Sequence, residues 1–158
     1  MGQSTERTVR ITAIPTEKGT GLAVPLHIGE YDTIHQILVI ENDLSLAHLE
    51  ADVLTAHGYS VVSVPNGAHA ISLLRQSLPD LVVLDLELMG EIHGWDVLRE
   101  LRALGSTPVL ITSSSTTARH YVRTSGETRS TLDHLAKPYP VEALLKRVKR
   151  MLPTSPDQ

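Results

Sequence analysis

The chain has 158 residues, no cysteine and a formal net charge of −4, and 41% of its residues are hydrophobic. This length suits one domain with an extension, and the apolar content is ordinary for a protein with its own core. The lack of cysteine excludes disulfides, thiolate catalysis and cysteine-ligated metals, while the mixed, slightly acidic charge argues against a nucleic-acid-binding module. No apolar run approaches the roughly 20 residues that span a bilayer, and residues 1–10 form no signal peptide, so we expect a cytoplasmic protein without membrane contact.

Residues 1–35 differ in composition from the rest of the chain. They are rich in threonine, glycine and proline, and only residues 9–14 alternate in the way of a short strand. This composition favours a flexible N-terminal extension, and residues 153–158 are expected to form a C-terminal tail. The folded domain is therefore expected over residues 36–152.

Within that domain, short apolar segments alternate with helical patterns. Continuous aliphatic or β-branched runs predict five strands, at residues 37–40, 59–64, 81–84, 108–111 and 131–136. Apolar residues at helical spacing predict helices that begin after Asp43, at Asn66-Gly67, near Gly94 and with Pro140 at the first position. Residues 113–130 are so polar that any helix there should be short and poorly amphipathic. The alternation predicts an α/β fold, a doubly wound parallel sheet with helices on both faces.

Polar residues follow the predicted strands at their carboxyl ends. They are Glu41, Asn42 and Asp43 after the first strand, Asp85 after the third, Thr112 and Ser113 after the fourth, and Lys137 after the fifth. In a parallel sheet these ends share one edge, so we expect the groups to converge. Crowded carboxylates need a cation, and oxygen ligands without histidine or cysteine suit Mg²⁺. A carboxylate nucleophile, Mg²⁺, a lysine and a hydroxyl together describe phosphoryl transfer onto Asp85.

Four segments of the chain carry a family resemblance. In this order, residues 37–43, 79–85, 108–113 and 135–139 resemble the motifs of the receiver domain of two-component response regulators, the CheY-like family. The resemblance implies a five-stranded sheet of flavodoxin-like order 2-1-3-4-5 and a phosphoprotein of signal transduction. It also implies that a histidine kinase or a histidine phosphotransfer protein donates the phosphoryl group and that an unknown output protein responds.

The resemblance assigns roles in the phosphoryl chemistry to individual residues. Asp85 matches the aspartate that accepts the phosphoryl group, and Lys137 matches the lysine that pairs with the phosphoryl oxygens. Ser113 matches the hydroxyl that moves to hydrogen-bond the phosphoryl group. Thr112 is the alternative if the loop is shifted by one residue.

The resemblance also implies a set of Mg²⁺ ligands. Glu41 and Asn42 occupy the positions of the metal-binding acidic pair, Asp85 adds its carboxylate, and Glu87 adds its backbone carbonyl. Asn42 departs from the family pattern, because a neutral amide stands where a second carboxylate is usual. One negative charge fewer should weaken Mg²⁺ binding.

Three further departures concern the surroundings of the site. The loop of residues 86–94 lacks the usual proline and has one residue extra, and His134 stands where an aromatic residue usually reports the switch. The usual Gly-Ala is missing from residues 113–130, which are normally the output surface.

The basic run of residues 146–150 is interpreted as a solvated face at a helix C-terminus.

Three hypotheses of function remain open at this stage. The first is a stand-alone receiver, not an enzyme, which signals by protein contact. The second is a degenerate receiver that binds partners without being phosphorylated, and Asn42 and the altered loop motivate it. The third is a phosphohydrolase with Asp85 as a transient nucleophile, which is disfavoured because Glu87 stands where a second aspartate would be needed.

Overall fold

A computed structural model of the chain describes residues 33–153. The strand expected at residues 9–14, nearly all of the expected N-terminal extension and residues 154–158 lie outside this range. The five strands are β1 (Gln36–Ile40), β2 (Ser60–Val64), β3 (Leu81–Asp85), β4 (Val109–Ser113) and β5 (Leu132–Ala136). The five helices are α1 (Leu44–Ala56), α2 (Gly67–Gln76), α3 (Gly94–Leu104), α4 (Thr116–Thr124) and α5 (Val141–Met151).

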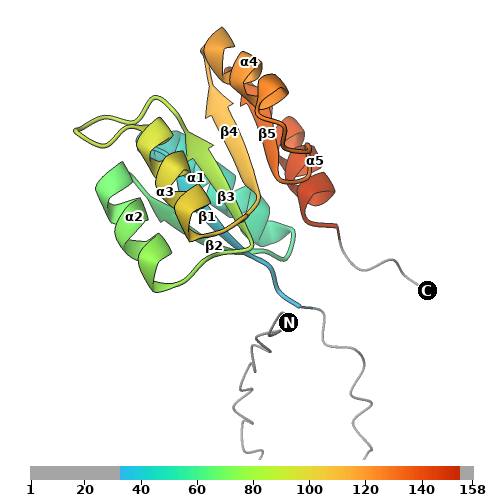
Figure 1. Ribbon diagram of the computed structural model, residues 1–158. Coiled ribbons are helices and arrows are strands. Elements are labelled where there is room, and N and C mark those ends of the chain that lie inside the picture. Colours follow the sequence, from blue (N-terminus) through green and yellow to red (C-terminus); the bar gives the residue numbers. More distant parts are fainter. Residues whose placement is uncertain (1–32, 154–158) are drawn as a thin grey trace, which may run out of the picture. The chain divides into compact units, whose positions relative to one another are not determined.

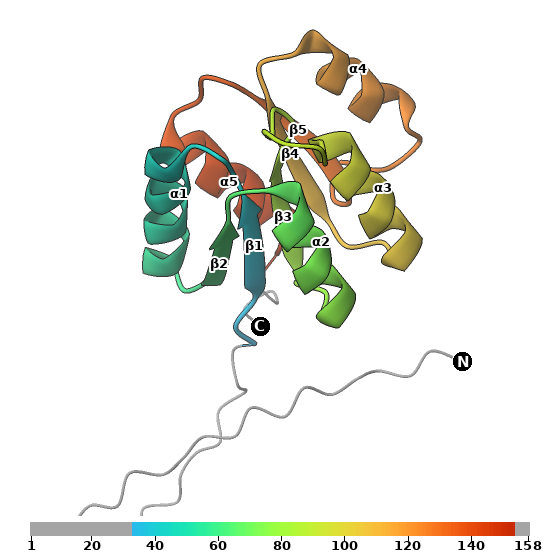
Figure 2. The ribbon, with the colours of Figure 1, turned by 90° about the vertical axis from the view of Figure 1, so that its left-hand side faces the viewer.

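The strands form one parallel sheet in the order β2-β1-β3-β4-β5. Figures 1 and 2 show α1 and α5 on one face of this sheet and α2 and α3 on the other. This arrangement confirms the predicted doubly wound α/β fold and its strand order. It also places the carboxyl ends of β1, β3, β4 and β5 along one edge, since neighbouring parallel strands run in the same direction.

The sheet separates two apolar cores, and strand alternation decides which residue enters which core. Leu81 and Val83 of β3 pack with α1 and α5, whereas Val82 and Leu84 pack with α2 and α3. All five residues of β3 are buried, as expected of a central parallel strand covered on both faces. Each apolar side chain buried in this way contributes about 1.5–3 kcal/mol to stability. The buried strand fixes the position of Asp85 at its end.

The N-termini of α1 and α3 fix the loops that follow β1 and β3. The Asp43 side chain caps α1 by accepting hydrogen bonds from the backbone N–H groups of Ser45 and Leu46. At the start of α3, a Cβ on Gly94 would lie only 2.6 Å from Leu86 Cα and 2.7 Å from the Asp85 carbonyl oxygen. A glycine is needed there because α3 packs directly against the backbone that follows β3.

Two expectations about α4 and α5 need correction. The polar segment does form a short helix, α4, but it is one-sided: Ala118 is fully buried and Val122 packs against the core one turn later. These two residues are four apart, the spacing of one helix face, and too few to stand out among polar neighbours. At α5, Pro140 is the N-cap residue, one position before the first helical residue.

Between residues 33 and 153 there is no helix of the length and hydropathy that crossing a membrane requires.

Candidate functional site

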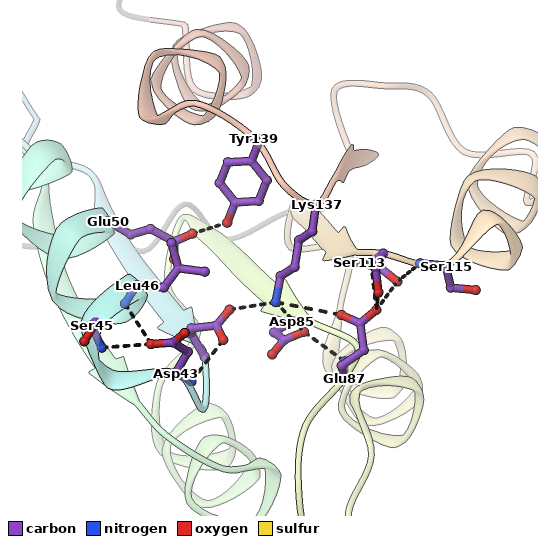
Figure 3. A network of polar contacts seen from close by, with 12 residues as sticks. Asp43, Ser45, Leu46, Glu50, Asp85, Glu87, Ser113, Ser115, Lys137 and Tyr139 are labelled. Atoms are coloured by element: carbon purple, nitrogen blue, oxygen red, sulfur yellow. Dashed lines mark hydrogen bonds and ion pairs between the residues drawn. The ribbon is translucent and has the colours of Figure 1, made fainter.

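The carboxyl ends of β1, β3 and β5 bring three of the expected site residues into contact (Figure 3). The Lys137 ammonium lies 3.1 Å from Asp85 Oδ1 and 3.2 Å from Glu41 Oε2. Both carboxylates are almost completely buried, with 1% of Asp85 and 2% of Glu41 exposed. Lys137 follows β5 directly and precedes Pro138 through a cis peptide bond. The sequence-based expectation that these groups converge is therefore met.

The two oxygens of the Asp85 carboxylate have different surroundings. Oδ1 accepts a hydrogen bond from the Glu87 backbone N–H at 2.8 Å in addition to its contact with Lys137. Oδ2 is buried and has no hydrogen-bond partner within the described chain. Since a buried carboxylate oxygen is normally paired, an unpaired one at a strand end is a candidate for binding a ligand.

The Glu87 side chain folds back over the site from the loop between β3 and α3. Its Oε1 accepts hydrogen bonds from Ser113 Oγ at 3.0 Å, from the Ser114 backbone N–H at 2.7 Å and from Ser114 Oγ at 2.6 Å. Its Oε2 lies 3.8 Å from Lys137 Nζ. Sequence reasoning gave Glu87 a role through its backbone carbonyl only and did not anticipate these side-chain contacts.

Of the two candidate hydroxyls, Ser113 is the one that contacts this group of charges. Alternation along β4 places Thr112 on the same sheet face as Leu110, toward α1 and α5, and Ser113 on the opposite face with Ile111. Ser113 Oγ also accepts a hydrogen bond from the Ser115 backbone N–H at 2.9 Å. A change at Ser113 would therefore be felt directly at the start of α4, whose N-cap is Ser115.

Burial and hydrogen bonding shift the pKa values of the charged groups in the site. Burial, with a smaller effect of the neighbouring Asp85, raises the pKa of Glu41 to about 7, although the Asp43 N–H and Lys137 oppose the shift. Burial also disfavours the Glu87 carboxylate, but hydrogen bonds from Ser114 and Ser113 outweigh it and lower its pKa to about 2. The pKa of Lys137 is raised because Asp85 and Glu41 outweigh the cost of its partial burial.

The donor set fits a hard divalent cation held by few protein ligands. Residues 33–153 contain no group of three or more His, Cys, Asp or Glu side chains placed to hold a metal together. A cation here would therefore be held by the free Asp85 oxygen, by Glu41 and by neutral oxygens and water, which is the way Mg²⁺ usually binds. The Asn42 side chain is half-buried and makes no hydrogen bond within the described residues. Asp43 does not replace it, because its carboxylate caps α1.

A second buried polar pair lies beside the site and was missed by sequence reasoning. The Tyr139 hydroxyl donates a hydrogen bond to Glu50 Oε1, and Glu50, on α1, is only 1% exposed. Burial raises the pKa of Glu50 above its usual value despite the hydrogen bond from Tyr139. The available signal was the position of Glu50, which lies one turn from both Leu46 and Leu54 on the apolar face of the helix.

Comparisons with known proteins agree with this geometry. The model of the response regulator receiver domain matches residues 37–149. The chain belongs to this family. The receiver is 34% identical over 128 residues to the DNA-binding response regulator MtrA of Mycobacterium tuberculosis H37Rv, an alignment that covers 80% of the chain and 55% of MtrA. It is 36% identical over 127 residues to the response regulator MprA of Mycobacterium sp. KMS, covering 78% of the chain and 53% of MprA. The receiver thus spans about half the length of these relatives.

Solved structures show the same fold. A putative response regulator from Chloroflexus aurantiacus J-10-fl superposes with a TM-score of 0.65 at 27% identity and covers 75% of this receiver and 98% of that chain. The signal receiver domain of a putative LuxO repressor protein from Vibrio parahaemolyticus gives a TM-score of 0.65 at 28% identity, with coverages of 75% and 90%. The chemotaxis protein CheY4 of Vibrio cholerae, at 22% identity and a TM-score of 0.63, supports the fold alone.

Proposed function

We propose that this receiver accepts a phosphoryl group on Asp85 from a histidine kinase or a histidine phosphotransfer protein and passes the signal on by protein contact. One observation carries the proposal. Asp85 is a buried carboxylate at a strand end, with one oxygen oriented by Lys137 and the Glu87 N–H and the other oxygen unpaired. Such a group is positioned and desolvated, as a nucleophile must be, and the Lys137 ammonium lies 3.1 Å from its Oδ1.

The chemical step is a phosphoryl transfer between two protein side chains. An Asp85 carboxylate oxygen forms a bond to phosphorus while the phosphorus–nitrogen bond of phosphohistidine breaks and its electron pair goes to the departing imidazole. Lys137 neutralises charge on the phosphoryl oxygens. Asp85, Glu41, Asn42 and the Glu87 backbone carbonyl would hold Mg²⁺, and the metal would supply further neutralisation of negative charge. The product is one aspartyl phosphate per chain, and its formation and loss are the two states of the proposed switch.

Glu87 competes with the phosphoryl group in this proposal. Its carboxylate already takes the Ser113 hydroxyl and the Ser114 N–H, and it lies within ion-pair reach of Lys137. These are the donors that a phosphoryl group on Asp85 needs. Phosphorylation therefore displaces the Glu87 carboxylate and lets Ser113 donate to the phosphoryl oxygen instead. Because Ser113 also holds the start of α4, the exchange alters that helix.

Treatment with acetyl phosphate tests the proposal. With millimolar Mg²⁺ we expect one phosphoryl adduct by intact mass and a change in the fluorescence of Trp95, whose ring packs edge-on against Tyr121 of α4 with centroids 4.8 Å apart. The Asp85→Asn variant should give neither signal at any Mg²⁺ concentration. An adduct of equal amount in Asp85→Asn would refute the assignment of Asp85.

A degenerate receiver is the second candidate function. It is favoured by the Glu87 carboxylate, which occupies the Ser113 and Ser114 donors, and by Asn42, whose amide is uncharged. In that case the domain would bind its partner in this state permanently. No adduct in the wild-type protein, together with partner binding that Asp85→Asn leaves unchanged, would favour this second function.

A further inference from the structure

A cavity lined by arginines lies beside the edge strand β5 and takes its lining from α4, β5, α5 and the loop before β5. Figure 1 shows α4 and α5 near this edge of the sheet. The volume of the cavity is about 460 Å³, within the range of sites for small molecules. Arg119 and Arg123 line it from α4, where a spacing of four residues puts them on one face. Arg129 lines it from the loop before β5, Arg147 from α5, and His134 from β5 itself. Arginines from two helices and one loop thus line the same hollow.

The two acidic residues of the cavity compensate only one of these arginines. Glu127 is held by Arg102 of α3 through two contacts, Nη2 to Oε1 at 2.8 Å and Nε to Oε2 at 3.0 Å. Asp133 is held by Arg147, with Nη1 2.8 Å from Oδ2, and by Arg150. Both carboxylates therefore already have partners, and Arg147 is the one cavity arginine that they compensate.

Arg119, Arg123 and Arg129 are left without a counter-charge. None of the three forms an ion pair or a hydrogen bond with any residue of the described chain. Their concentration is unexpected in a protein whose formal net charge is −4. Like charges held close together repel, so an anion between them would be bound with favourable electrostatics.

We propose that this cavity binds a compact anion that carries two or more phosphoryl groups, such as the diphosphate of an inorganic or nucleotide ligand. Arginine presents several N–H donors in a fixed fork and pairs well with phosphate oxygens. The arginines line one open hollow of about 460 Å³ from two helices and a loop instead of forming a flat stripe, which favours a compact ligand over an extended acidic peptide. The site goes beyond the proposed phosphorylation of Asp85 and is independent of it.

His134 provides a local reporter for this site. Burial lowers the pKa of its imidazole, and Arg119 and Arg147 lower it further, while the Ser113 backbone and Asp133 oppose the shift. An anion bound among the arginines would offset their effect on the imidazole. We therefore expect the ring resonances of His134 to move on binding and its pKa to rise.

Calorimetric titration of the protein with inorganic pyrophosphate, in Mg²⁺-free buffer with a chelator, tests the proposal. The matched variants are Arg119→Ala/Arg123→Ala, which removes two cavity arginines, and Lys149→Ala, an exposed cation of α5 outside the cavity. We expect the double variant to bind pyrophosphate at least about tenfold more weakly, because each charge-assisted hydrogen bond contributes strongly. Lys149→Ala should change the affinity by less than about twofold, as a surface charge outside the contact does.

The outcomes distinguish specific binding by the cavity arginines from nonspecific electrostatic attraction of anions. Tighter binding of ADP than of pyrophosphate, with the same arginine dependence, would identify the ligand as a nucleotide, and equal binding would identify the diphosphate alone. No binding at millimolar pyrophosphate, equal losses in both variants, or unmoved His134 resonances would overturn the proposal. Tighter binding of a poly-glutamate peptide that depends on the same arginines would also overturn it and would indicate an acidic protein partner.

Discussion

The carboxyl end of β3 and the outer edge of β5 each bury an aspartate, but the two regions complete its surroundings differently. Asp133 in β5 is 5% exposed and has Arg147, Arg150 and the His134 N–H as partners. Asp85 in β3 is 1% exposed and keeps one oxygen without a partner. A buried carboxylate with every oxygen paired stabilises the fold, whereas one with a free oxygen is available for chemistry.

The balance of charge around the two aspartates differs in the same way. Three carboxylates share the single ammonium of Lys137 at the end of β3. At the edge of β5 the acids are paired and three arginines are not. The uncompensated sign indicates the kind of ligand that each region can accept: a cation at the first, an anion at the second.

The largest effect on stability is expected at Asp133. Asp133→Ala leaves Arg147 and Arg150 without their shared carboxylate. It should lower the free energy of unfolding by about 1–2 kcal/mol, less than for a fully buried pair because both arginines are more than a third exposed. Asp85→Ala should leave stability unchanged or raise it, because it relieves repulsion with Glu41. Urea unfolding of both variants at pH 7 measures the difference. Equal destabilisation would contradict the contrast between a structural and a functional aspartate.

Removal of the Glu87 side chain should speed the chemistry at Asp85. In Glu87→Ala, Ser113 and Lys137 no longer have this competing carboxylate, and we expect phosphorylation by acetyl phosphate to be about tenfold faster, equivalent to roughly 1.4 kcal/mol in the barrier. Glu91→Ala is the control, since Glu91 is an exposed acid of the same loop. An unchanged or slower rate in Glu87→Ala would show that its carboxylate does not occupy the phosphoryl position.

Asn42→Asp should strengthen Mg²⁺ binding, by no more than the factor of about ten expected for the phosphorylation rate of Glu87→Ala. The added carboxylate gives a hard cation another charged ligand, and several-fold tighter binding, of the order of 1 kcal/mol, is expected. Calorimetric Mg²⁺ titration of the wild type and the variant measures it. Identical affinities would mean that Asn42 lies too far from the metal to be a ligand.

The smallest effect is expected at Glu50 and depends on pH. Because folding raises the pKa of Glu50 above its usual 4.5, the folded state binds this proton more tightly than the unfolded chain. The contribution of Glu50 to stability is therefore complete below about pH 4.5 and declines as the pH rises through the folded-state pKa. Glu50→Gln does not titrate, so its melting temperature relative to wild type should rise by a few degrees between pH 5 and pH 8. A constant difference would contradict a titrating Glu50.

The sequence allowed the sheet and the placement of the candidate residues to be predicted, because both follow from local pattern. Buried parallel strands are continuous apolar runs, and parallel strands end at a common edge, so Glu41, Asp85 and Lys137 could be brought together in advance. The ion pairs and hydrogen bonds that surround these residues could not be predicted. The return of the Glu87 side chain depends on the path of a loop, and the pairing of Asp133 with Arg147 and Arg150 depends on packing between β5 and α5. The interpretation of the basic residues of α5 as a solvated face is confirmed for the exposed Lys146 and Lys149, but it missed the ion pairs of Arg147 and Arg150 with Asp133.

Location of the phosphoryl group is the most direct test of the central claim. After reaction with acetyl phosphate and Mg²⁺, borohydride reduces an aspartyl phosphate to homoserine, and tandem mass spectrometry of the digested protein then identifies the modified residue. We predict modification at residue 85 and at no other carboxylate. Modification at Glu41 or Glu87, or an unmodified protein under conditions where Mg²⁺ binds, would contradict the assignment of Asp85 as the phosphoryl acceptor.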